Sequence, residues 1–412
     1  MTTFAILSRL IAPSAYAQFA VLAFVYTICS LATDLSSMGF LLVHGDSATN
    51  RRLAWRSATL SAAGGACLLA IAATTLTLAP LPLGPPGLAN SAILVLGLVA
   101  QALSQPPRAQ LMLRRAYSRI AVTDIAATAV TVVVTVLLAQ VNASVTVLCT
   151  QLTLLSVVRL LLVAALSARR ETFSDMANGS SGGAAMGPVA YGLRVLPLNV
   201  ASYASRSIDS GVLPLILPAT AAATYSRSYQ LIISPITQIQ LSLGGALVER
   251  LARHADGDPA AARRFNGALW AALHTLTFSA AIALSLGAPL IQSIFFGPAW
   301  QHVDVFVAAM AALLPSLTLS TYISWKLQIS ANIRHSLANL TVLMLVPFLA
   351  ITLALTSGTS GAVIGLAAGA LIQGLLLAIM HRSYLPTRLW LVLLQIVTEW
   401  IVLAALVALR LS

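Results

Sequence analysis

Apolar residues run along the chain in long blocks that short polar gaps interrupt. A membrane-spanning helix needs about 20 predominantly apolar residues, and the blocks predict twelve such helices. Residues 1–10 form a further apolar fragment that is too short to span a bilayer. The pattern therefore predicts an all-α polytopic membrane protein with about 12 full transmembrane helices and an N-terminal partial helix. The predicted segments are residues 15–43, 53–79, 90–112, 118–140, 143–167, 189–214, 220–247, 266–293, 303–330, 336–356, 360–380 and 389–409.

Basic residues occur at every second connection between the apolar blocks. Sixteen Arg residues fall at these alternate connections, whereas the intervening gaps contain neither Arg nor Lys. Short loops rich in Arg and Lys are retained on the cytoplasmic side of a membrane. The alternation therefore predicts that the chain starts inside and that the connection at residues 167–187 is cytoplasmic. The sixteen residues are Arg51, Arg52, Arg56, Arg108, Arg114, Arg115, Arg119, Arg169, Arg170, Arg250, Arg253, Arg263, Arg264, Arg334, Arg382 and Arg388.

The longest polar connection predicts a division of the chain into two lobes. It contains a run of Gly and Ser at residues 178–183, and such a composition behaves as a flexible linker. The run falls near the middle of the apolar array, so we expect about six helices on each side of it. The expected parts are an N-lobe over residues 1–170, a linker over 171–188, a C-lobe over 189–380 and an extra C-terminal helix over 381–412.

Composition and charge support a membrane protein and exclude several other classes. The chain is 58% hydrophobic and 8% charged, whereas soluble domains are usually about a quarter charged. The net charge of +12 could indicate a nucleic-acid partner, but the basic residues lie in short gaps, so we expect none. Cys29, Cys67 and Cys149 stand singly in apolar segments, and we expect no metal site and no cofactor. The short connections leave no room for a soluble catalytic domain, and no catalytic motif is present, so we do not expect an enzyme.

Four charged residues stand in residues 189–244, a stretch that otherwise consists of two apolar segments. A charge inside a bilayer costs about 2.5–3.5 kcal/mol, so such residues normally face a bundle interior or a wet cavity. Arg206 and Asp209 share a helix face and form either a structural ion pair or a pair that lines a cavity. Arg194 either lines the same cavity or extends to the cytoplasmic surface. Arg227 is either an interface anchor or the outer rim of an anion site.

Further ionisable residues lie inside other segments. Lys326, the only Lys in the chain, is a candidate for the substrate cavity. Glu399 lies in the middle of the last segment, and it is a candidate for ion coupling together with Asp209. The alternative for Glu399 is a protonated or paired carboxyl group that faces its lobe. We expect Arg159 and His274 to extend to the surface or to pack, because they lie near cytoplasmic helix ends.

Glycines recur at every fourth position in Gly361, Gly365 and Gly369. Small residues at this spacing allow close contact between membrane helices. We expect a structural role for these glycines.

Short motifs are spread over nearly the whole chain. They comprise residues 7–16, 34–37, 206–209, 225–229 with Pro235, and the run Phe-Phe-Gly-Pro-Ala-Trp at 295–300. Together they resemble Wzx-type polysaccharide and O-antigen flippases, within the multidrug/oligosaccharidyl-lipid/polysaccharide exporter superfamily. The resemblance implies two pseudo-symmetric six-helix lobes around a central, cation-lined cavity, alternating access and coupling to an ion gradient. Relative to that family the first helix is short, so we expect either a truncated first helix or a start codon placed too late.

The resemblance implies translocation of an undecaprenyl-diphosphate-linked oligosaccharide across the bacterial inner membrane. The expected partners are this lipid-linked oligosaccharide, membrane lipids, a polysaccharide polymerase and the chain-length machinery. Two alternatives stay open: a multidrug or small-molecule exporter of the same fold, and a truncated relative without activity. A multidrug exporter favours carboxylates and aromatic residues in the cavity over Arg.

Overall fold

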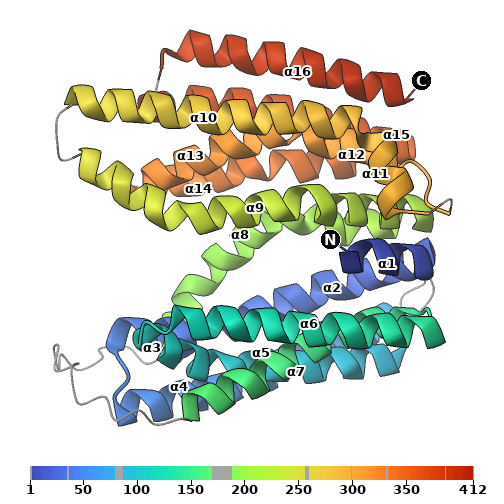
Figure 1. The fold of residues 1–412 in the computed structure, drawn as a ribbon, viewed down its shortest axis with the longest axis vertical. Helices are drawn as coiled ribbons and strands as arrows, with labels where there is room; N and C mark the ends of the chain where they lie inside the picture. The colour runs from blue at the N-terminus through green and yellow to red at the C-terminus, as the bar shows by residue number, and fades with distance from the viewer. Residues whose placement is uncertain are drawn as a thin grey trace. The chain divides into compact units, whose positions relative to one another are not determined.

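The computed structural model describes residues 2–34, 37–78, 87–168, 188–255, 259–297, 299–330, 333–385 and 387–411. These residues form sixteen α-helices and one 3-10 helix, and the described part of the chain contains no strand (Figure 1). The prediction of an all-α protein is therefore confirmed. The expected linker at 171–188 lies almost entirely outside the described residues, so the predicted lobe boundaries stay predictions.

Nine helical stretches within the described ranges are long and apolar enough to cross a membrane. They confirm a multi-pass membrane protein, and most of them coincide with predicted segments. The longest stretch, Arg334–Met380, has 47 residues and includes the two predicted segments at 336–356 and 360–380. The predicted total of twelve stays a prediction.

One compact unit of the structure comprises residues 10–203 and is called the N-unit here. Its centre is α5, which packs against α2, α3, α4, α6 and α7. Gly97 of α5 lies so close to Thr153 of α7 that an added Cβ would come within 2.7 Å of the Thr153 hydroxyl oxygen. The helices are α2 (Pro13–Asp34), α3 (Ser37–His44), α4 (Ala48–Leu78), α5 (Leu88–Leu113), α6 (Tyr117–Val141), α7 (Val145–Ala168) and the first part of α8 (Pro188–Ile216).

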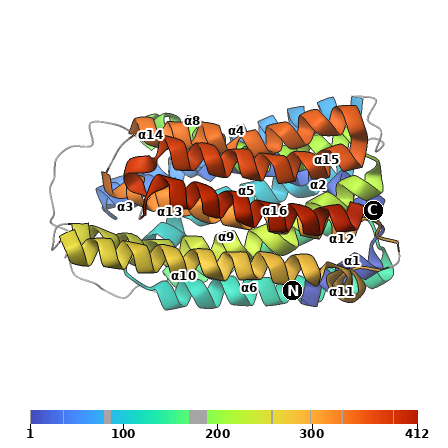
Figure 2. The ribbon, with the colours of Figure 1, turned by 90° about the horizontal axis from the view of Figure 1, so that it is seen from above.

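The second compact unit, called the C-unit here, comprises residues 3–9 together with 204–412. Its centre is α12, which packs against α9, α10, α11, α15 and α16. The long helices α9, α10, α15 and α16 run alongside one another in Figure 2. The helices are α1 (Thr2–Leu10), the second part of α8, α9 (Ala219–Ala255), α10 (Pro259–Leu286), α11 (Ala288–Phe295), α12 (Val303–Ala312), α13 (Leu314–Ser330), α14 (Ile333–Leu343), α15 (Leu345–Met380), the 3-10 helix η1 (Arg382–Tyr384) and α16 (Leu389–Leu411).

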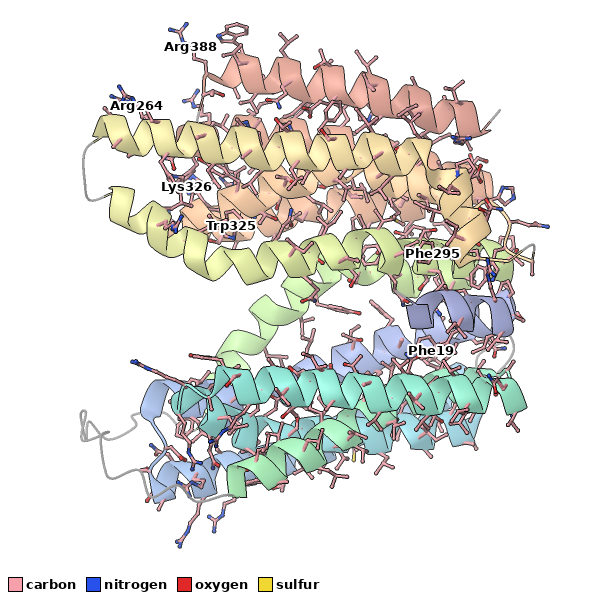
Figure 3. All side chains as sticks on the ribbon, in the orientation of Figure 1. Phe19, Arg264, Phe295, Trp325, Lys326 and Arg388 are labelled. Carbon is pink, nitrogen blue, oxygen red and sulfur yellow. The ribbon has the colours of Figure 1, made fainter. Side chains whose placement is uncertain are left out.

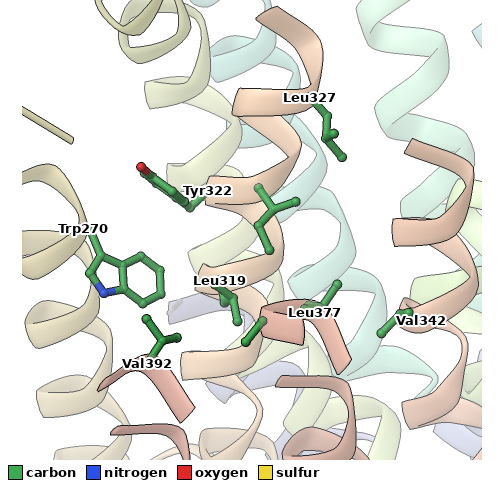
Figure 4. Packing of buried hydrophobic residues seen from close by; sticks show 9 residues of the cluster. Trp270, Leu319, Tyr322, Leu327, Val342, Leu377 and Val392 are labelled. Carbon is green, nitrogen blue, oxygen red and sulfur yellow. The ribbon is translucent and has the colours of Figure 1, made fainter. Parts of the chain in front are cut away.

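A hydrophobic cluster joins five helices of the C-unit (Figure 4). Trp270 of α10 and Tyr322 of α13 meet edge to face, with 5.5 Å between their ring centroids. Apolar side chains of α14, α15 and α16 complete the cluster. It consists of Trp270, Leu319, Tyr322, Ile323, Leu327, Val342, Leu377, Ala378 and Val392.

The two ends of the C-unit differ in charge as the sequence predicts. Figure 3 shows Arg264, Lys326 and Arg388 near one end of the helices, and Phe295 near the opposite end. The first end carries the connections that the positive-inside rule assigns to the cytoplasm. Phe295 belongs to a connection that lacks Arg and Lys.

Helix α1 binds the last turn of α11 and the segment that follows it. The Arg9 guanidinium donates hydrogen bonds to the carbonyl oxygens of Ser293 and Ile294, at 2.8 and 2.9 Å. These carbonyls lie in the last turn of α11, where backbone acceptors lack intrahelical partners and attract a cation. The buried Trp300 donates its indole N–H to the carbonyl oxygen of Ser8 at 2.6 Å. Two of the family-like motifs, at 7–16 and 295–300, therefore contact each other.

The glycine repeat of α15 lies in a tight helical hairpin. Gly358 has φ +60° and breaks the helix where the sequence predicted a connection. Beyond this break, an added Cβ on Gly365 would lie 2.6 Å from the Ala350 Cα, and one on Gly369 would lie 2.9 Å from the Val346 Cα. The close contact between the two halves of α15 supports the structural role that we expected.

We expect Gly365→Ala to destabilise the C-unit by about 1–3 kcal/mol, the usual cost of forcing extra atoms into a packed contact. The neighbouring atoms belong to the backbone of Leu349 and Ala350, which cannot rotate away. Thermal unfolding of the purified protein in detergent measures the effect. Gly267→Ala is the matched control, because no atom lies within 4 Å of the new Cβ there. Equal midpoints for both variants would contradict the close contact.

Candidate functional site

A cavity whose wall combines apolar and polar side chains lies within the helices of the C-unit. Its empty volume is about 920 Å³, with solvent at its mouth included. Helices α8, α9, α13 and α15 supply most of the wall. The lining residues are Ser205, Asp209, Tyr229, Ile233, Thr237, Gln240, Leu313, Leu317, Ser320, Thr321, Ser324, Trp325, Leu343, Val346, Pro347 and Gln373. We call this space the C-unit cavity.

Asp209 is the only carboxylate among the described lining residues of this cavity. Asp209 is 3% exposed, and helix α8 holds it against α9. The Tyr225 hydroxyl donates to Asp209 Oδ2, and the Ser210 backbone N–H donates to Oδ1 at 2.8 Å. The Tyr225 ring is fixed in turn by an edge-to-face contact with Phe306, with 5.6 Å between centroids. Two donors on a buried carboxyl group hold it in one orientation at the cavity wall.

Neutral polar groups form a second feature of the wall, between α9 and α13. The buried Gln240 amide donates to the Thr318 hydroxyl at 3.3 Å and accepts from the Thr321 hydroxyl at 2.9 Å. Between α13 and α14, the Asn339 amide donates to the hydroxyl of the lining residue Ser324 at 3.0 Å. Buried polar groups in membrane proteins are hydrogen-bonded because an unsatisfied group is costly. These residues give the cavity hydrogen-bonding capacity without adding charge.

The predicted arginines of α8 and α9 have different outcomes. The side chains of Arg194 and Arg206 lie outside the described part of the structure, so the predicted ion pair of Arg206 with Asp209 stays a prediction. Arg227 is 7% exposed, and its guanidinium donates to the Gln230 amide oxygen at 2.8 Å. Its proposed role at the rim of an anion site is untested.

Lys326 lies next to the C-unit cavity, directly after the lining residues Ser324 and Trp325. Its ammonium group donates to the Asn266 amide oxygen of α10 at 2.8 Å. It also lies 5.8 Å from the centroid of the Tyr322 ring. The structure therefore directs this ammonium group toward α10, and a role in the cavity stays a prediction.

Glu399 of α16 is paired with His274 of α10. The His274 Nε2 atom lies 2.9 Å from Glu399 Oε2, and Gln395 donates to Oε1 at 3.0 Å. The His274 ring stacks on Trp270, with 4.7 Å between centroids. Both residues line a small, mainly apolar space that shares no lining residue with the C-unit cavity. This geometry matches the alternative of a paired carboxyl group that faces its lobe.

Sequence patterns missed most of the uncharged cavity wall. Gln240, Thr321 and Gln373 are isolated polar residues in apolar helices, and only their depth in predicted segments could have marked them. No group of three or more His, Cys, Asp or Glu side chains within the described ranges could hold a metal ion. Within the described residues, the site is therefore a cavity with one fixed carboxyl group and several neutral hydrogen-bonding groups in an otherwise apolar wall.

Comparison with known proteins agrees with these observations. Residues 6–304 match the family described as "Polysaccharide biosynthesis protein", and no curated protein matches the chain significantly. The solved structure described as "Lipid II flippase MurJ, inward closed conformation" is similar, with a TM-score of 0.66 and 11% identity over 99% of this chain and 94% of that one.

A second solved structure is similar over almost the whole chain. It is described as an inward-facing conformation of a multidrug resistance MATE family transporter of the MOP superfamily. The TM-score is 0.56 at 17% identity, over 93% of this chain and 94% of that chain. At such identities both likenesses show a shared fold alone. The match over residues 6–304 shows that the chain belongs to the polysaccharide biosynthesis protein family, which confirms the resemblance found in its motifs.

Proposed function

We propose that this protein moves an undecaprenyl-diphosphate-linked oligosaccharide from the cytoplasmic to the periplasmic leaflet of the bacterial inner membrane. The observation that carries the proposal is a cavity with a fixed carboxyl group and neutral hydrogen-bonding groups in its wall, inside the helices of a polysaccharide biosynthesis protein. A sugar chain needs hydrogen-bonding partners when it leaves water, and hydroxyl and amide groups supply them. The fold is shared with a structure described as a lipid II flippase.

Translocation by alternating access fits this chemistry. The lipid tail stays in the bilayer while the polar head group occupies the cavity, so the protein needs to replace only the hydration of the head group. Coupling to an ion gradient requires a group that binds and releases a cation, and a buried carboxyl group such as Asp209 has that capacity. A polymerase and the chain-length machinery are the proposed partners on the receiving side.

The proposal predicts protein-dependent flipping in reconstituted vesicles. Purified protein is placed in liposomes with a fluorescent undecaprenyl-diphosphate-linked oligosaccharide, and an impermeant quencher reports the fraction in the outer leaflet. We expect quenching to exceed one half of the label only in vesicles that contain the protein. Empty liposomes, and liposomes with an unrelated membrane protein, are the controls. Flipping no faster than in these controls would contradict the proposal.

A multidrug exporter is the second candidate, and one observation, the composition of the C-unit cavity wall, favours it. Among the described lining residues, the C-unit cavity contains a carboxylate and the aromatic residues Tyr229 and Trp325, but no Arg or Lys. Such a wall suits an organic cation, through charge and cation–π attraction. Efflux of a cationic dye from the same vesicles, without movement of the oligosaccharide, would support this alternative.

A further inference from the structure

A second, polar cavity lies in the N-unit, where two arginines from different helices converge on one carboxylate. The Arg108 Nη2 atom lies 3.0 Å from Asp124 Oδ2, and the Arg159 Nε atom lies 2.8 Å from Asp124 Oδ1. Arg108 belongs to α5, Asp124 to α6 and Arg159 to α7, and these helices pack side by side (Figure 1). We expected Arg159 to extend to the surface or to pack, and the structure instead directs it to Asp124.

These arginines line a space with an empty volume of about 640 Å³, called the N-unit cavity here. All three charged residues lie inside helices that are apolar enough to span a membrane. Arg108 stands five residues from the end of α5 at Leu113, which is about 8 Å at the usual helical rise. Asp124 stands seven residues, about 10 Å, from Tyr117, and Arg159 stands nine residues, about 14 Å, from Ala168. These ends adjoin the basic connections. The cavity lining consists of Met38, Gln101, Ser104, Gln105, Arg108, Met112, Ser156 and Arg159.

The charges in this cluster do not balance. Among the described residues, two guanidinium groups share one carboxylate, which gives this group of three a net charge of +1 within apolar helices. A structural ion pair would need a single arginine, because a second cation in the bilayer adds cost without a counterion of its own. Each guanidinium has five N–H donors, and the side chains are 23% and 28% exposed. The cluster is therefore able to accept an anion.

The uncharged residues of the N-unit cavity also favour binding of an anion. The Tyr26 hydroxyl donates to the Gln101 amide oxygen at 2.9 Å and lies 3.3 Å from the Ser156 hydroxyl. This contact occupies the amide oxygen of Gln101 and leaves its NH₂ group as a donor. The Ser104 and Ser156 hydroxyls donate to backbone carbonyl oxygens, so the amide groups are the neutral donors of this wall. Amide donors beside two guanidinium groups match the several oxygens of a diphosphate, which bind Arg through paired, charge-assisted hydrogen bonds.

We propose that Arg108 and Arg159 bind the diphosphate group of the transported lipid on the side of the basic connections, where it displaces Asp124 as their counterion. The inference rests on the proposed function for the identity of the carrier, but the anion site itself rests on the geometry of the N-unit. Asp124 holds the two arginines in place while the site is empty. When the diphosphate enters, each arginine exchanges one carboxylate oxygen for phosphate oxygens.

The test is binding of farnesyl diphosphate, a short polyprenyl diphosphate, to the purified full-length protein in detergent. We expect Arg108→Gln and Arg159→Gln each to weaken binding about ten- to a hundredfold, the usual effect of losing a charge-assisted hydrogen bond. We expect Asp124→Asn to tighten binding, because it removes the competing carboxylate and leaves both cations. The triple variant, in which all three residues become Gln or Asn, carries no charge in the cluster and should fold without binding.

Controls separate this site from surface charge and from structural effects. Arg51→Gln removes the same charge from an exposed pair with Asp46, and it should leave binding unchanged. Inorganic pyrophosphate and farnesol are the other probes. A diphosphate site binds pyrophosphate and not farnesol, and tighter binding of farnesyl diphosphate than of pyrophosphate identifies the lipid as the source. Equal affinity for the two diphosphates supports the site and identifies a free anion.

Two results would overturn the site. One is binding by Arg108→Gln and Arg159→Gln that equals that of the parent protein. The other is an Asp124→Asn variant that unfolds at lower temperature and binds no more tightly, because a purely structural cluster behaves in that way. The flipping assay keeps the two proposals distinct. Flipping that survives both Arg variants overturns the site alone, whereas diphosphate binding without flipping by the parent overturns the proposed function alone.

Discussion

Asp209→Asn is expected to lower the rate of oligosaccharide flipping about tenfold or more, since a loss of 1.4 kcal/mol in the transition state is already tenfold. The amide has the shape of the carboxyl group, and its oxygen can still accept from Tyr225 or Ser210. The variant should therefore fold with an intact cavity. It loses only the capacity to carry a negative charge or to exchange a cation. The vesicle assay, with initial rates compared at equal protein content, measures the effect.

The same variant tests ion coupling through Asp209. We expect an imposed ion gradient to accelerate flipping by the parent protein and to have no effect on Asp209→Asn. Asp46→Asn is the matched control, because it makes the same chemical change in a surface ion pair with Arg51. Unchanged flipping and unchanged gradient response in Asp209→Asn would remove Asp209 from the mechanism. If Asp209→Asn abolishes dye efflux but leaves oligosaccharide flipping unchanged, the residue would act in multidrug export instead.

Tyr225→Phe separates charge from orientation at the same place. It removes the hydroxyl that donates to Asp209 and keeps the carboxyl group in the buried position. A buried acceptor that loses its donor costs about 1–3 kcal/mol, so this variant should be less stable than Asp209→Asn. If instead the phenylalanine variant is as stable as the parent and Asp209→Asn is unfolded, the carboxyl group has a structural role.

The distribution of charge between the two cavities bears on the choice of substrate. Among the described lining residues, the C-unit cavity has a carboxylate and no base, and the N-unit cavity has two arginines. The resemblance implied a single cation-lined cavity formed by both lobes. In the described residues, the lining carboxylate and the two lining arginines occur in different units. A lipid-linked diphosphate that moves with a cation needs a basic group and an acidic group, whereas an organic cation alone needs only the acidic group.

The helices were predictable from the sequence because each depends on a local pattern. A run of about 20 apolar residues predicts a span wherever it occurs, and alternate basic connections predict its direction. The hairpin at Gly358 was visible for the same reason, since the glycine spacing lies within 12 residues of the break. Buried charge in a predicted span also marked Asp209, which lines the C-unit cavity in the structure.

The pairing of charged side chains was not predictable, because it depends on which helices pack together. Arg159 and Asp124 are 35 positions apart, and His274 and Glu399 are 125 positions apart. The sequence suggested a surface or packing role for Arg159 and His274 and left the partner of Glu399 unnamed, and it did not single out Asp124. The contact of Trp300 with Ser8 spans 292 positions. A single sequence contains no signal that connects such distant positions.

The buried pair of His274 and Glu399 leads to the second large effect. We expect Glu399→Leu alone to destabilise the C-unit by about 1–3 kcal/mol, because it leaves the buried His274 ring without its polar partner. The double variant Glu399→Leu with His274→Leu should recover most of this loss, since apolar side chains of similar volume fit the surrounding helices. Unfolding of the four proteins of this double-mutant cycle measures the coupling between the two residues.

The double variant also decides between a structural pair and an ion-coupling residue. The pair lies in a mainly apolar space that shares no lining residue with the C-unit cavity. A structural pair can be replaced by apolar residues without loss of transport, so we expect the double variant to flip the oligosaccharide and to respond to the gradient like the parent. Gln395→Leu, which removes only one hydrogen bond to Glu399, is the control for local repacking. A double variant that is folded but no longer responds to the gradient would assign coupling to Glu399, and Asp209 would then have to act on the substrate instead.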